Sequence, residues 1–382
     1  MEPAQPLTGR DEAPPPGAAV LSNTAIPRFG YQQPVEIEVD MDPDEAANRA
    51  ATPTHDGDTI NSTRSLYASD IVYDVENGRT YCGEYYMPID EAETDRLQLV
   101  HQVYLRVSNG ALTTVPLFNP TKILDIGTGK GDWAMAIADQ YPDAEVIGTD
   151  IAKVQPTAVP PNVFFEIDDA EDESGWTFAE DDFDLIHFRN LSGAFTDWDH
   201  IYHEAWTHLK PGGWLEVLDF DEHKGLLSCF EPDSEVARFL RTIGEASIRS
   251  GRPRTVRHLD PDKFRDLGFE EIVTAEHEIP FGQWHEDKEK KFLGRLWLTI
   301  CLVSMEALSM RLLTREMGWE PEEVRRMCNL VETEVIECVK DKKRIYGCLV
   351  KMKIVRARKP VGPSSPSDDG PEALMVDENE DA

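Results

Sequence analysis

The stretch Ile123-Leu124-Asp125-Ile126-Gly127-Thr128-Gly129-Lys130-Gly131-Asp132-Trp133 leads from an apolar run through three alternate glycines into a helical pattern. Glycines at such a turn allow a tight reversal of the chain, and they let a ligand approach backbone N–H groups with no side chain in between. The stretch therefore predicts a strand, a ligand-binding loop and a helix. An ordinary strand-to-helix turn of an α/β protein has the same local form, so the loop alone does not decide the function.

The spacing of these glycines disfavours two kinds of nucleotide loop. A dinucleotide loop, GxGxxG, needs its third glycine at position 132, where Asp132 stands. A P-loop needs Ser or Thr after its lysine, and Lys130 is followed by glycine. The remaining interpretation is a strand–acid–glycine loop for S-adenosylmethionine. Asp125 would organise this loop and face the ammonium group of the ligand, while the amides of the three glycines (Gly127, Gly129 and Gly131) approach its body.

Further acids follow the next two predicted strands. Asp150 lies about 20 residues beyond the glycines, the distance at which an acid accepts hydrogen bonds from ribose hydroxyls. Asp168 and Asp169 end the following strand, where they can accept from an adenine amino group. We therefore predict a cofactor site formed by these acids and the adjacent Ile151. Each acid alone is also typical of a solvated turn or a helix cap in so acidic a chain.

Short apolar runs alternate with helical patterns from residue 122 onward, which is typical of a parallel sheet covered by helices on both faces. The alternation predicts an α/β fold. The predicted strands are 122–126, 145–149, 163–167, 183–188, 214–218, 270–279 and 346–355. The predicted helices are 133–140, 198–209, 234–249, 261–267, 289–317 and 321–339, and the last two belong to an insert at about 284–342 that would form a lid.

Composition divides the chain into four parts. Residues 1–65 are rich in Pro and Asp without an apolar period, and residues 359–382 form an acidic Pro/Ser tail, so both are predicted to be disordered. Between them we expect a helical lid segment at 66–118 and the main domain at 119–358.

The charge and the cysteines exclude several classes of protein. Thirty-eight Lys and Arg against 72 Asp and Glu give a net charge of -34, which disfavours nucleic acid as a partner. The apolar run 296–303 is shorter than a membrane span, and no secretory signal is recognisable, so no membrane association is expected. We predict no metal site, because His203-Glu204 lacks the second histidine of HExxH and no CxxC pair occurs. All six cysteines are predicted to be reduced thiols: Cys82, Cys229, Cys301, Cys328, Cys338 and Cys348.

In combination, several stretches resemble a known family. They are 123–133, Tyr141-Pro142-Asp143-Ala144-Glu145, 159–171, 183–189, Leu209-Lys210-Pro211-Gly212-Gly213-Trp214 and, upstream, 78–81 and 86–101. The chain is similar to seven-stranded S-adenosylmethionine-dependent methyltransferases, and more narrowly to the fungal LaeA-like methyltransferases. The likeness covers roughly residues 70–360 and weakens after Phe220. Lys130, Asp132 and the run 151–156 depart from the pattern of the family.

The resemblance implies a Rossmann-like seven-stranded sheet and methyl transfer from S-adenosylmethionine. If the acceptor needs a general base, the candidates are His187, which would also touch the cofactor, and His223. Arg189 follows the fourth strand and is a candidate for acceptor binding, as are Tyr81 and Tyr86 upstream. For both histidines a structural or surface role is the favoured interpretation.

Two functions fit the resemblance. The first is a cytoplasmic enzyme that methylates a small-molecule acceptor in fungal secondary metabolism. The second is a LaeA-like nuclear regulator of secondary-metabolism genes, acting within a protein complex. The sequence contains no compact Lys/Arg cluster that would act as a nuclear import signal, which favours the first. A scaffold that binds the cofactor without turnover is a third interpretation, because Lys130 and Asp132 add charge inside the loop.

Overall fold

The computed structural model describes residues 72–227 and 229–361. The predicted disordered segment 1–65 and most of the predicted acidic tail lie outside the described residues. The side chain of His223 also lies outside them.

A seven-stranded sheet forms the centre of the described part of the chain, in the order β5-β4-β3-β6-β7-β9-β8. The first five strands of this order are parallel, and β9 pairs antiparallel with both β7 and β8. The Rossmann-like α/β fold class is therefore confirmed. The strands are β3 (Lys122–Ile126), β4 (Glu145–Asp150), β5 (Val163–Ile167), β6 (Phe183–Arg189), β7 (Leu209–Asp221), β8 (Glu270–Pro280) and β9 (Leu349–Arg358).

Helices cover both faces of this sheet, because successive side chains of each buried strand point to opposite faces. On one face, Ile123 and Leu185 pack with Trp133 and other residues of α3 (Asp132–Gln140). On the other face, Leu124, Ile186 and their neighbours pack against α4 (Trp198–His208) and α7 (Pro261–Asp266). Each core is dry and apolar, so burial of these side chains fixes the register of the central strands.

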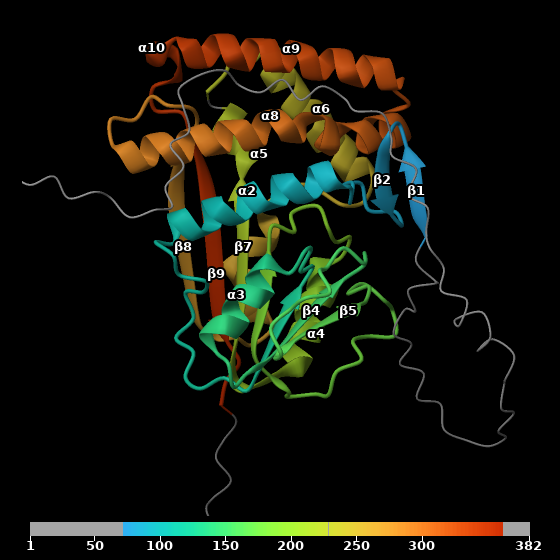
Figure 1. Ribbon diagram of the computed structural model, residues 1–382, viewed down its shortest axis with the longest axis vertical. Coiled ribbons are helices and arrows are strands. Elements are labelled where there is room, and N and C mark those ends of the chain that lie inside the picture. The colour runs from blue at the N-terminus through green and yellow to red at the C-terminus, as the bar shows by residue number, and fades with distance from the viewer. Residues whose placement is uncertain (1–71, 228, 362–382) are drawn as a thin grey trace, which may run out of the picture. The chain divides into compact units, whose positions relative to one another are not determined.

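A helical layer lies across one end of the sheet (Figure 1). It contains α2 (Glu91–Val107), α6 (Glu235–Arg249), α8 (Lys288–Met317) and α9 (Pro321–Lys340), with the short helices α5 (Glu222–Leu227) and α10 (Lys342–Ile345) beside them. One apolar core joins these helices to the ends of β7 and β9. The predicted helical insert is therefore present as α8 and α9.

By length and composition α8 is long enough and apolar enough to cross a membrane. However, 56% of its most apolar window is buried inside the protein, with Trp297 and Met310 fully covered. Core helices of soluble proteins pass the same test, so this is weak evidence for a span. The sequence prediction considered only the run 296–303, whereas the apolar character of α8 extends beyond it.

The predicted helical lid segment, 66–118, is only partly helical. Its described part, residues 72–118, contains an antiparallel hairpin, β1 (Tyr73–Glu76) and β2 (Arg79–Cys82), and α2 is the one helix in that part. The buried Arg311 of α8 holds this hairpin in place. Its guanidinium donates to the carbonyl oxygens of Gly83 and Tyr85 and to the carboxylate of Glu76, at 2.7 to 2.8 Å. The tether explains why a short two-stranded sheet, which is marginal alone, is ordered here.

Two sequence predictions about chain ends and cysteines are wrong. Cys229 and Cys348 form a disulfide across a sequence separation of 119 residues, whereas all six cysteines were predicted to be reduced. The pairing arises because β9 returns beside α5, a contact that cysteine spacing does not encode.

The acidic tail was predicted to begin at 359, but Lys359 is fixed, since its ammonium donates to Asp181 and to two carbonyl oxygens.

The steric role of Gly131 leads to a first prediction. Its φ is +80°, and a Cβ there would lie 2.1 Å from the ring of Phe165. The other side of this ring packs closely against Gly148, so the ring has little room to move away. Gly131→Ala should therefore lower the free energy of unfolding by about 1–2 kcal/mol for the left-handed backbone and by about 1–3 kcal/mol more for overpacking. Gly110 is the matched control: its φ is +84°, and no atom lies within 4 Å of the Cβ position. Urea unfolding of both alanine variants tests this, and equal losses would show that Phe165 imposes no constraint.

Candidate functional site

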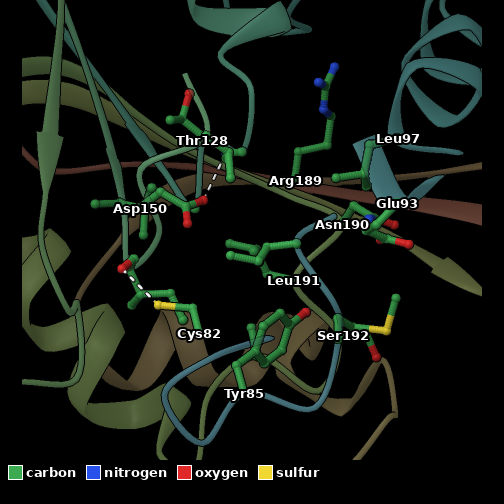
Figure 2. A pocket seen from close by; sticks show the side chains of 18 of the residues that line it. Cys82, Tyr85, Glu93, Leu97, Thr128, Asp150, Arg189, Asn190, Leu191 and Ser192 are labelled. Atoms are coloured by element: carbon green, nitrogen blue, oxygen red, sulfur yellow. Dashed lines mark hydrogen bonds between the residues drawn. The ribbon is translucent and has the colours of Figure 1, made fainter. Parts of the chain in front are cut away.

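A cavity of about 550 Å³ opens at the carboxyl ends of the central strands, beneath α2 and α8. It lies where β3 has β4 on one side and β6 on the other, the switch point at which open α/β sheets bind ligands. Its volume is in the range of ligand pockets. Figure 2 shows side chains from the hairpin, from α2 and from the strand ends converging on it.

The glycine loop is held by the acid that precedes it. Asp125 is buried, and one carboxylate oxygen accepts from the Thr128 hydroxyl at 2.6 Å. The other oxygen faces Nδ1 of His187 at 2.8 Å. Asp125, Gly127 and Gly129 line the cavity. The predicted role of Asp125 in organising the loop therefore has a structural basis. Gly131 does not line the cavity and instead makes room for Phe165.

Asp150 ties the second strand to the same loop. Its Oδ2 accepts from the amide of Gly129 at 2.8 Å, and its Oδ1 accepts from the amide of Ala152 at 3.0 Å. Burial raises the pKa of Asp150 despite these hydrogen bonds. Each oxygen keeps a free lone pair, because a carboxylate oxygen accepts more than one hydrogen bond. Asp150 and the adjacent Ile151 line the cavity.

Asp168 and Asp169 form the far end of the cavity. Burial raises the pKa of Asp168 to about 6, and the neighbouring Asp169, Glu166 and Asp172 add to the rise by repulsion. A site that gathers carboxylates in this way is complementary to a ligand that presents hydroxyl and amino donors. The predicted acids at the ends of three adjacent strands are thus brought together in one cavity.

The donor set fits S-adenosylmethionine. The cavity offers acceptors at the positions where the cofactor has donors: Asp150 for ribose hydroxyls and Asp168 or Asp169 for the adenine amino group. A Cβ at Gly127 would lie 2.6 Å from the Leu191 side chain. Glycine at this position therefore lets the loop pass close to Leu191. Two of the three predicted glycine amides already donate within the protein: that of Gly129 to Asp150, and that of Gly131 to the carbonyl oxygen of Thr128.

His187 does not reach the cavity. It is fully buried in β6, and its ring stacks on Trp133 with centroids 3.6 Å apart. Its Nδ1 faces the Asp125 carboxylate at 2.8 Å, and its Nε2 has no hydrogen-bond partner among the described residues. The structure therefore places His187 behind Asp125, where it positions that carboxylate.

Three of the predicted acceptor residues lie in different surroundings. Arg189 lines the cavity. Tyr81 is buried under the guanidinium of Arg311, 4.5 Å from its ring centroid, and burial raises its pKa to about 12. Tyr86 is also buried, and its hydroxyl accepts from Arg254 at 2.8 Å. Neither tyrosine lines the cavity, whereas Tyr85 does.

The part of the cavity beyond the glycine loop contains ion pairs that the sequence analysis missed. Glu93 pairs with Arg96 on α2, and Glu222 pairs with Arg254 at 3.1 Å. Ser304 and Leu308 of α8 complete this half, and Asp219 stands at its floor. The strand-end rule that selected Asp125 would also have selected Asp219. Glu93 and Arg96 are an i, i+3 pair on one helix, whereas Glu222 and Arg254 lie 32 residues apart, so no local signal marks the second pair.

Asp219 is buried and anchors the loop after β6. Its Oδ2 accepts from the amide of Leu191 at 3.2 Å and lies 3.2 Å from Nε2 of His258. Nδ1 of His258 donates to the carbonyl oxygen of Thr255 at 3.0 Å. The buried contact therefore joins His258 to Asp219, which lines the cavity.

The helical histidines do not gather around a metal position. His208 bonds through Nδ1 to the carbonyl oxygen of Ala179, and its Nε2 lies 3.5 Å from Glu204. Across residues 72–227 and 229–361, no group of three His, Cys, Asp or Glu side chains is arranged to hold a metal ion.

The comparisons with known proteins agree with this site. A family model described as a methyltransferase domain matches residues 99–266. The methyltransferase pytC of Aspergillus terreus is 35% identical over 303 residues, which cover 77% of this chain and 88% of that protein. The secondary metabolism regulator LAE1 of Cochliobolus heterostrophus is 35% identical, covering 64% of this chain and 83% of that protein. The protein-methionine methyltransferase laeA of Emericella nidulans is 32% identical, covering 75% and 76%.

Among solved structures, the cyclopropane synthase MmaA2 of Mycobacterium tuberculosis aligns with a TM-score of 0.41 at 17% identity, over 68% of this chain and 83% of that one. A score this low supports no inference about function. The sequence relatives, by contrast, match across most of their own length. The chain therefore belongs to the LaeA-like family of S-adenosylmethionine-dependent methyltransferases.

Proposed function

We propose that this methyltransferase transfers the methyl group of S-adenosylmethionine to a small-molecule acceptor in fungal secondary metabolism. The proposal rests on one observation. The acids predicted to bind the cofactor and the residues of α2 and α8 line one continuous cavity. Its volume of about 550 Å³ suits the cofactor together with a small acceptor. The similarity to pytC, a protein named as a methyltransferase, supports it.

The bound cofactor supplies an electrophilic methyl group on a positively charged sulfur. Displacement by a nucleophile needs alignment more than elaborate machinery, so the residues act mainly by positioning and by excluding water. Asp150 and Asp168 would hold the adenosine part, and the loop from Asp125 to Gly129 the amino-acid part. The α2 and α8 side chains over the cavity would shield the reacting atoms from solvent.

If the acceptor is a hydroxyl, a group in the cavity must receive its proton. Asp219 lies in the cavity floor, and Nε2 of His258 lies 3.2 Å from its carboxylate. We therefore assign this role to Asp219 and give His187 the role of a positioning residue. His223 is the second residue of α5 and follows the cavity residue Glu222, and it stays a candidate.

A second candidate function is regulation of secondary-metabolism genes. LAE1 is as similar in identity as pytC, and the relative from Emericella nidulans is named a protein-methionine methyltransferase. Under this alternative the acceptor is a protein side chain, and the chain acts in the nucleus within a complex. Under the first proposal it acts in the cytoplasm, and fluorescence microscopy of a tagged chain distinguishes the two locations.

The cofactor site yields a second prediction. Asp150→Ala should weaken binding of S-adenosylhomocysteine by on the order of 10- to 100-fold, because a charged acceptor for the ribose and an anchor of the loop are both lost. Asp143→Ala is the matched control, since Asp143 is an exposed acid just before the same strand. Calorimetric titration of the wild type and both variants measures this. A well-folded wild type that binds neither S-adenosylmethionine nor S-adenosylhomocysteine would refute the proposed function.

The acceptor class is decided by a turnover assay. Cofactor carrying a labelled methyl group is incubated with the wild-type protein and either fungal small-molecule extracts or methionine-containing peptides. Label in a small molecule is expected, whereas label confined to peptides would favour the regulator. Absence of label in both, despite cofactor binding, would favour the scaffold.

The proposed role of Asp219 gives a third prediction. Asp219→Asn keeps an oxygen that can accept from the Leu191 amide, but it cannot take up a proton. With a hydroxyl acceptor, kcat should fall by about 10²- to 10⁴-fold, while binding of S-adenosylhomocysteine changes little. Asp221→Asn is the control, because Asp221 lies on the same strand and pairs with Lys353 outside this cavity. Equal rates for the wild type and Asp219→Asn would remove Asp219 from the proton transfer.

A further inference from the structure

Arg189, the last residue of β6, presents an unpaired cation to the cavity. Its guanidinium lies 4.9 Å from the centroid of the Tyr104 ring, and the residue lines the cavity. Arginine has five N–H donors. Among the described residues, no carboxylate or carbonyl oxygen accepts a hydrogen bond from any of them.

The other arginines of the same cavity are all satisfied. Arg96 is paired with Glu93, Arg252 with Glu171 and Arg254 with Glu222. Within the described part of the chain, Arg189 is thus the one arginine of this cavity whose charge has no ion-pair partner. Because a buried charge without a partner is unfavourable, its presence indicates that a ligand supplies the missing anion.

The position of Arg189 indicates which part of a ligand it meets. The charged groups that act on it most are Asp125 and Asp132, at the two ends of the glycine loop. Burial lowers the pKa of Arg189, yet arginine remains charged in proteins. In Figure 2 its side chain extends away from Tyr85 and Ser192, which belong to the other half of the cavity.

Neighbouring groups leave this position free for an anion. His101 of α2 lines the same region, and burial together with Arg189 lowers its pKa to about 4, so it is neutral at physiological pH. No side chain caps the N-terminus of α3, whose first residue, Asp132, also lines the cavity. The carboxylate of Asp132 in the same turn offsets the weak positive potential of these amides, so the guanidinium is the group that would bind the anion.

Asp125 and Arg189 together present one negative and one positive group on the same side of the cavity. The amino-acid end of S-adenosylmethionine carries the complementary pair, an ammonium and a carboxylate on one carbon. We propose that Arg189 is the receptor for the cofactor carboxylate, so that the predicted acceptor-binding residue is instead a determinant of cofactor recognition. This inference rests on the proposed function, because it assumes that S-adenosylmethionine occupies the cavity.

A carboxylate on the methyl acceptor is the alternative ligand for Arg189. The experiment separates the sources by changing the ligand. Three ligands are titrated calorimetrically: S-adenosylhomocysteine, its decarboxylated analogue, which keeps the amine, and 5′-methylthioadenosine, which lacks both groups. Each is measured with the wild type, Arg189→Gln and Arg252→Gln.

In the wild type, removal of the carboxylate should weaken binding by on the order of 10- to 100-fold, the usual effect of losing a charged hydrogen bond. In Arg189→Gln this ratio should fall close to one, since the receptor is gone. Binding of 5′-methylthioadenosine should be equal in both proteins, which shows that the variant is folded. Arg252→Gln, whose guanidinium is already paired, should keep the wild-type ratio.

Two outcomes would overturn the inference. One is a wild type that binds S-adenosylhomocysteine and its decarboxylated analogue equally. The other is an Arg189→Gln variant that retains the wild-type ratio, and loss of turnover in such a variant would assign Arg189 to the acceptor. If the wild type binds none of the three ligands, the proposed function itself has failed.

Discussion

The turn between β3 and α3 is the constraint on which the site depends. Gly127, Gly129 and Gly131 all have positive φ, a conformation that side chains with a Cβ rarely adopt. The turn directs α3 back along one face of the sheet and leaves the loop bare above the strand ends. Asp125 and Asp150 then fix the loop by hydrogen bonds from inside. One backbone feature thus creates both the packing of α3 and the floor of the cavity.

The roof of the cavity depends on a different set of interactions. Arg311 joins α8 to the hairpin, and the apolar side chains of α8 pack against α2 and α9. The disulfide between Cys229 and Cys348 links the chain after α5 to the start of β9. These contacts join segments distant in sequence. The pair of Glu222 and Arg254 exists because this roof brings its members together.

The two halves of the cavity differ in how their charges are arranged. In the α2 and α5 half, acids and bases are paired within the protein, so a neutral acceptor enters without breaking strong interactions. In the cofactor half, carboxylates gather near the strand ends and one arginine is left unpaired. This arrangement suits a ligand with several donors and one carboxylate. The charge pattern therefore separates cofactor recognition from acceptor binding within a single cavity.

The sequence by itself determined the sheet, the glycine loop and the acids that follow the strands. These features depend on local periodicity and on residues next to one another, and the strand ends of a parallel sheet necessarily meet at one edge. Only the tertiary structure decided that His187 lies behind Asp125, that Tyr85 rather than Tyr81 or Tyr86 lines the cavity, and that Cys229 meets Cys348. Such contacts depend on which side chains face each other across separate elements, and their partners lie 60 residues or more away along the chain in most cases. The spacing of residues along the chain therefore does not predict these contacts.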